Sequence, residues 1–155
     1  MENSGKAKKG AERYLDFLAE EGFRPRINEN GDVAFKYEGG SYVIRIDEND
    51  EMYFCLVFPN FWRIESVEEL SRVKEIALAV TAEYKVLKII PVVDFNTSAT
   101  VQLFCSPPET FKEVFYRCLR AICAAVKEFS AKMQELPKPA DDFVFHLPKY
   151  KVGSN

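Results

Sequence analysis

The side chains that could do chemistry are few in this sequence, and they are widely spaced. Its only histidine, His146, lies between Phe145 and Leu147 near the C-terminus. A Ser-His-Asp or Cys-His site needs an activated nucleophile, and the sequence contains neither G-x-S-x-G nor another nucleophile motif. We therefore expect His146 to be a packed or exposed residue of a terminal segment, and we assign no catalytic residue.

The cysteines form no C-x-x-C pair and have no spacing that would combine them with the histidine as metal ligands. They lie inside apolar strand or helix patterns, at Cys55, Cys105, Cys118 and Cys123. Cysteines in such patterns are usually buried and reduced. We expect neither disulfides nor a bound metal ion.

Two acidic features could bind an ion or act in catalysis. The segment 47–51 begins like a calcium-binding loop, but Met52 occupies the place of its glycine and Phe58 that of its bidentate glutamate. An acidic hairpin turn explains this segment better. Asp94 follows the apolar run 89–93 and is the most plausible buried acid, although an aspartate at a strand end usually supports a turn.

Composition limits the classes of partner. The chain has 155 residues, 47% of them hydrophobic, and a formal net charge of −3. This suits a single domain with a sizeable core, and it argues against nucleic acid or an anionic membrane as partner. The short basic run of Lys6, Lys8, Lys9 and Arg13 is interpreted as a solvated, frayed N-terminal tail. Without a secretory signal or a window of roughly 18 apolar residues, we expect a cytoplasmic protein.

Helix-forming sequence flanks a central stretch of three predicted strands. Periodicity predicts a first helix at about residues 7–21, and the segment 23–27, interrupted by Pro25, can pair only weakly at a sheet edge. Strands are expected at 33–37, 42–47 and 53–58. Gly39-Gly40 allows a tight hairpin turn between the first two, and because it does not precede a helix it is not a phosphate-binding loop. No cofactor is expected.

The third of these strands is apolar on both faces, whereas the second alternates between an apolar and a mostly polar face. A sheet with only one covered face would not need two apolar faces on one strand. We expect the terminal tail, a second subunit or a client protein to cover its other side.

Three aromatic residues surround a proline at the end of the third strand: Phe58, Phe61 and Trp62. They either pack under the next helix as a secondary core, as aromatic residues beside a main sheet usually do, or form an apolar surface for a partner. They are our candidate partner-binding residues.

The second half of the chain predicts a helix, a hairpin and a long helix. Ser66 and Glu69 form a capping box for a helix that ends at about residue 84. Strands at 86–95 and 99–105 should form a hairpin in which Pro91 marks a bulge or an edge. A second capping box, from Ser106 to Glu109, opens a last helix that reaches about residue 136 and has a wide apolar stripe.

We therefore expect an α+β fold with an antiparallel sheet of about five strands packed by helices, in the order α-βββ-α-ββ-α. Residues 1–136 would form a single domain. Residues 137–155 would form an extended C-terminal tail that could pack back through its apolar residues, which are Phe143, Phe145, Leu147 and Tyr150.

This order of elements, with VAFKYEGGSYVIRID and KVLKIIPVVDFNTSATVQLF as its hairpin segments, resembles the type III secretion chaperone-like fold and, within it, the YbjN-like bacterial proteins. The resemblance covers residues 11–135. It implies a curved antiparallel sheet, a homodimer, and action by binding other proteins. The aromatic end of the third strand and the additional tail depart from the pattern, so no binding residue is carried over.

Two functions of different classes follow. The first, which we favour, is a non-enzymatic protein-binding module, chaperone-like or regulatory, that presents apolar surface on the sheet and the second helix to a client or a second copy. It predicts that Phe58, Phe61 and Trp62 are partly exposed. The alternative is a small-molecule-binding protein or enzyme, with a pocket of the curved sheet lined by Tyr42, Tyr53 and Asp94.

Overall fold

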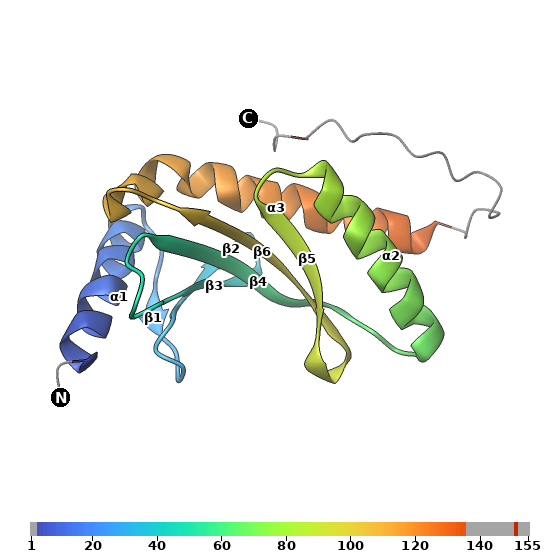
Figure 1. The fold of residues 1–155 in the computed structure, drawn as a ribbon, viewed down its shortest axis with the longest axis horizontal. Helices are drawn as coiled ribbons and strands as arrows, with labels where there is room; N and C mark the ends of the chain where they lie inside the picture. The colour runs from blue at the N-terminus through green and yellow to red at the C-terminus, as the bar shows by residue number, and fades with distance from the viewer. Residues whose placement is uncertain (1–2, 136–150, 152–155) are drawn as a thin grey trace.

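The fold is α+β, with one six-stranded antiparallel sheet and the element order that the sequence predicts. The computed structural model describes residues 3–135 and residue 151 (Figure 1). In chain order the elements are α1 (Asn3–Glu20), β1 (Arg26–Ile27), β2 (Val33–Tyr37), β3 (Gly40–Arg45), β4 (Tyr53–Arg63), α2 (Val67–Glu83), β5 (Leu87–Val92), the 3-10 turn η1 (Val93–Phe95), β6 (Asn96–Phe104), the 3-10 turn η2 (Pro108–Thr110) and α3 (Phe111–Gln134).

The sheet has the strand order β1-β2-β3-β4-β6-β5, so that β4 and β6 are its central strands. β1 is a two-residue edge strand directly after Pro25, which confirms the weak edge pairing expected there. The other edge is β5, and it carries Pro91. Proline has no N–H to donate to a further strand, so both edges are poorly suited to extend the sheet.

Helices pack on one face of this sheet. Figure 1 shows α3 running along the sheet, with α1 and α2 near its two ends. Every buried helical side chain belongs to one core cluster, which also includes Phe35, Ile44, Phe54 and Leu56 of the sheet. The long apolar stripe of the last helix is therefore a core face.

Local sequence explains most element boundaries. The β2–β3 turn places Glu38 and Gly39 at φ 45° and 80°, in the left-handed region that tight hairpin turns use. At the start of α2 the Ser66 hydroxyl accepts a hydrogen bond from the Glu69 N–H at 3.0 Å, as a capping box predicts.

Three boundaries differ from the sequence-based expectation. α1 begins at Asn3, so residues 3–6 continue the helix. β4 continues to Arg63 because a register shift between Phe58 and Trp62 accommodates the proline. α3 begins at Phe111, because residues 108–110 form a 3-10 turn and Thr110, without a side-chain cap bond, precedes the helix. The tail predicted at 137–155, including His146, lies outside the described residues except for Lys151.

Candidate functional site

The second face of the sheet can be identified from strand register. Val43 pairs with Val57, Val57 with Thr100, and Thr100 with Lys88, so these four side chains form one row across β3, β4, β6 and β5. Because side chains alternate along each strand, the neighbouring positions follow. We call this surface the open face and define it as Ala34, Lys36, Ser41, Val43, Arg45, Tyr53, Cys55, Val57, Lys88, Ile90, Ser98, Thr100, Gln102 and Phe104.

The open face lies outside the helix-packed core. Cys55 is only 2% exposed, yet it does not belong to the core cluster. Ile90 and Phe104 are 37% and 74% exposed. In residues 3–135, the helices contribute their buried side chains to the core on the opposite face. The described part of the chain therefore leaves the second apolar side of β4 without a helix over it.

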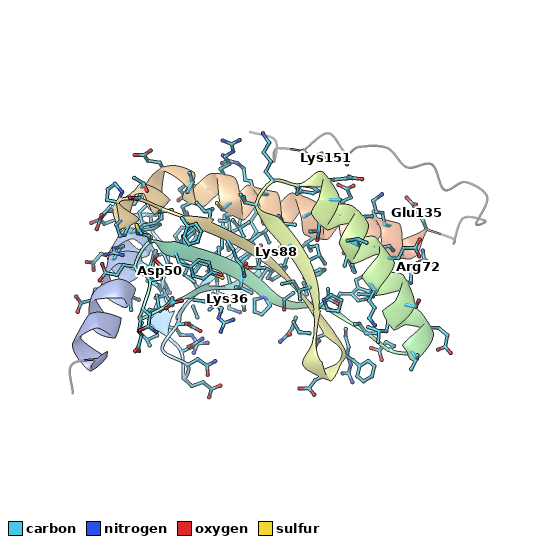
Figure 2. All side chains as sticks on the ribbon, viewed as in Figure 1. Lys36, Asp50, Arg72, Lys88, Glu135 and Lys151 are labelled. Carbon is cyan, nitrogen blue, oxygen red and sulfur yellow. The ribbon has the colours of Figure 1, made fainter. Side chains whose placement is uncertain are left out.

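The open face has a group of small residues on its central strands. Cys55, Ser98 and Thr100 of the central strands are buried, and the Cys55 thiol lies 3.6 Å from the Thr100 hydroxyl. Lys36 lies on β2, next to the edge strand β1, and Lys88 lies on the edge strand β5, and both are exposed (Figure 2). We call the part of the open face between Lys36 and Lys88, with these small residues at its centre, the trough.

The charge of the open face is positive. Lys36, Arg45 and Lys88 are exposed, and its defining residues include no acid. Lys36 donates a hydrogen bond to the Ser41 hydroxyl, and Lys88 donates one to the side-chain amide oxygen of Gln102 at 2.6 Å. Neutral acceptors leave these two ammonium charges uncompensated, so an anionic group that approaches the trough would be attracted.

One end of the open face is hollowed. A cavity of about 480 Å³ lies there between strand residues and the β3–β4 turn, lined by Arg45, Ile46, Asp47, Glu48, Asn49, Tyr53 and Cys55. Burial beside Cys55 raises the pKa of Tyr53 to about 12, although Arg45 opposes the shift. The Tyr53 ring is 6.2 Å from that of Phe104. Tyr53 is therefore a neutral hydroxyl at neutral pH, able to donate or accept a hydrogen bond.

The candidate residues Phe58, Phe61 and Trp62 are half-buried and lie against the helix-packed core. Phe58 stacks on Tyr42 with ring centroids 4.6 Å apart. Phe61 and Trp62 both pack edge to face with Phe129 on α3, with ring centroids 5.3 and 5.7 Å apart. The three residues are therefore partly exposed and pack against the core that includes α3, and their role in partner binding stays a prediction.

The pocket proposed from Tyr42, Tyr53 and Asp94 does not form. Tyr42 is 3% exposed within the core, whereas Tyr53 lies on the open face. Asp94 lies in η1, at the turn between β5 and β6. The sequence places the two tyrosines on separate strands but gives no register between them, and a one-residue difference in register changes the face.

Reactive groups are not assembled into a site in the described residues. All four cysteines are free thiols, and burial raises the pKa of Cys118 to about 11. No three His, Cys, Asp or Glu side chains come together there in a way that could hold a metal ion. The arrangement on the open face offers hydrogen bonds, apolar contact and positive charge, which are the means of binding.

The basic residues of the open face were not identified from the sequence. Strand alternation predicts that Arg45 faces away from Ile44, but only the strand order places Lys36, Arg45 and Lys88 on one surface. The available signal was the basic character of Lys36, Arg45 and Lys88 at outward strand positions, although the predicted strand 42–47 also placed Asp47 outward.

Comparisons with known proteins add no relative: no family model, curated protein or solved structure matches this chain. None of the helices in the described ranges has the length and apolar character required to cross a membrane.

Proposed function

We propose that this protein is a non-enzymatic binding module whose open face takes an acidic, amphipathic helix of a partner protein. The observation that carries the proposal is a surface with aliphatic Val43, Val57 and Ile90 between exposed lysines, which no helix of the described chain covers. The type III secretion chaperone-like resemblance agrees with a protein-binding role. It is also compatible with regulation of the bound partner.

An amphipathic helix suits this surface for two reasons. Val43, Val57 and Ile90 offer aliphatic contact, and a helix about 10 Å wide needs two or three strands spaced about 4.8 Å apart. These aliphatic side chains suit a leucine-rich helix face, and the aromatic residues Tyr53 and Phe104 of the open face can add further apolar contact. The flanking Lys36 and Lys88 would meet carboxylates on the polar edges of the helix.

The aromatic residues Phe58, Phe61 and Trp62 remain a second contact surface in this proposal. Their intramolecular contacts support the open face as the principal one, because the Trp62 indole N–H already donates to a Glu69 carboxylate oxygen at 3.0 Å. Homodimerisation through a face of the molecule also remains a proposal, which the resemblance supports.

Binding of defined peptides tests the proposed function. We would measure fluorescence anisotropy with a labelled leucine–glutamate amphipathic helix, a leucine–lysine helix of equal length and a single-stranded RNA. The acidic helix should bind, and K36E/K88E should weaken it about tenfold or more because attraction becomes repulsion. The charge-matched control K74E/K112E changes exposed lysines of α2 and α3 and should leave binding unchanged.

Val57→Asp supplies a second variant, because it places a charge on the floor of the trough. Equal affinity of wild type and K36E/K88E for the acidic helix would refute the proposed site. Preference for RNA would overturn the partner class. Light scattering that shows a dimer broken by Val57→Asp would identify a second copy as the occupant instead.

A further inference from the structure

The seam between α2 and α3 contains two carboxylates in a fixed arrangement. Glu83 ends α2, and Glu128 lies on α3, with side chains 28% and 20% exposed. The Tyr84 hydroxyl donates a hydrogen bond to Glu128 Oε2 at 2.8 Å and so orients that carboxylate. Two partly buried carboxylates repel each other unless a cation lies between them.

The cation is Lys151, which comes from the C-terminal segment. Its Nζ lies 2.6 Å from Glu83 Oε2 and 2.9 Å from Glu128 Oε1. Its backbone also takes part, because the Lys151 N–H donates to the Glu83 carbonyl and the residue forms a parallel bridge with Tyr84. Figure 2 shows Lys151 beside the end of α2. Contact through both backbone and side chain is more specific than a surface ion pair.

The electrostatics agree with a site built for an ammonium group. Burial disfavours the charged form of Glu128, yet Lys151 and the Tyr84 hydroxyl together hold its pKa below the usual value. The adjacent carboxylates of Glu83 and Glu128 raise the pKa of Lys151. Lys132 contributes little, since its Nζ is 4.0 Å from Glu128 Oε1.

We propose that Lys151 acts as a latch on the α2–α3 seam and that this latch fixes the end of α2 against α3. The opposite end of α2 has its own fastening, because Arg72 donates to the carbonyl of Lys132 at 2.9 Å and to that of Glu135 (Figure 2). The Thr81 hydroxyl near the latched end accepts the Ile89 N–H at 2.9 Å. Because Thr81 holds α2 to β5 independently of Lys151, release of Lys151 would loosen the end of α2 from α3.

Hydrogen exchange of the full chain, read by mass spectrometry on the peptide that contains residue 151, tests the latch. The Lys151 amide should exchange at least about tenfold more slowly in the wild type than in Lys151→Glu, because its carbonyl partner is lost on release. Glu83→Lys should also release it, since the new ammonium would pair with Glu128 and repel Lys151. The control Lys127→Glu, an exposed residue of α3, should keep the amide protected.

The double variant E83K/K151E provides the decisive comparison. It again places one cation between two carboxylates, so protection of amide 151 should return. Fast exchange in the wild type, or no recovery in a double variant whose circular dichroism is unchanged, would overturn the latch.

Discussion

At the scale of single residues, Glu69 links the aromatic end of β4 to the start of α2. Its N–H donates to Ser66, its Oε2 accepts the Glu65 N–H at 2.6 Å, and its Oε1 accepts the Trp62 indole N–H. The capping box identifies the residue but not this second contact, because Trp62 and Glu69 meet only when the chain turns from strand to helix.

Glu69→Ala should lower the free energy of unfolding by about 1–3 kcal/mol, because it leaves the indole N–H and a backbone N–H without acceptors. The matched change Glu68→Ala, at an exposed position of the same turn, should cost less than about 0.5 kcal/mol. Urea unfolding followed by Trp62 fluorescence measures both. Equal losses of unfolding free energy in the two variants would show that the Glu69 carboxylate contributes only through its interaction with the helix dipole.

Tyrosine ionisation should lower the stability of the fold at alkaline pH. Burial is the largest cause that raises the pKa of six tyrosines above the ordinary value of 10.0, namely Tyr14, Tyr37, Tyr42, Tyr53, Tyr84 and Tyr116. A raised folded pKa contributes stability that is complete below the unfolded pKa and is lost as pH rises toward the folded one. Absorbance at about 295 nm and circular dichroism should therefore change together above about pH 10. Full ionisation near pH 10 with an intact fold would contradict this.

At the scale of elements, the β2–β3 hairpin depends on two adjacent glycines for different reasons. Gly39 has a φ of 80°, whereas Gly40 is needed for space. A Cβ on Gly40 would lie 3.0 Å from the Tyr42 ring and 3.1 Å from the Phe58 ring. These rings stack on each other, so neither can move alone.

Gly40→Ala should therefore destabilise the protein by about 1–3 kcal/mol through overpacking. Gly10→Ala is the informative counterpart, because a Cβ there meets only Ile46 at 3.5 Å and α1 gains helix propensity. It should stabilise by about 0.5–1 kcal/mol. Thermal unfolding should shift in opposite directions for the two variants, and a shift in the same direction would refute the account of Gly40.

Sequence patterns predict local elements here better than their arrangement. Turn and cap residues such as Gly39 and Ser66 act on their near neighbours, so the hairpin and the start of α2 could be predicted. The bulge around Asn60, whose φ is 54°, has no glycine to mark it. The central position of β6 depends on long-range pairing that no local pattern encodes. The sequence therefore could not predict that Lys36 and Lys88 lie on the same face of the sheet.

At the scale of the whole molecule, the faces and the edges of the sheet have opposite properties. One face is filled by helices, the open face is bare in the described chain, and both edges are blunted. Association should therefore use faces rather than edges.

Replacing Pro91 tests the role of the β5 edge. Pro91→Thr gives the edge strand another N–H and a β-branched side chain, so it should promote association that increases with concentration. Val92→Thr, in the same strand, adds no N–H and should not. Light scattering across a concentration series compares them, and identical masses would mean that α2 rather than the proline protects this edge.

Because both edges are poorly suited to pair with a further strand, they also limit the number of chains that can join a complex. Strand addition at an edge regenerates a free edge, so growth by that route continues into fibres. A contact through the open face buries that surface. A complex of two copies, or of one copy and one partner, therefore leaves no open face free for a further chain. The proposed contact through the open face therefore predicts that high local concentrations give small complexes rather than polymers.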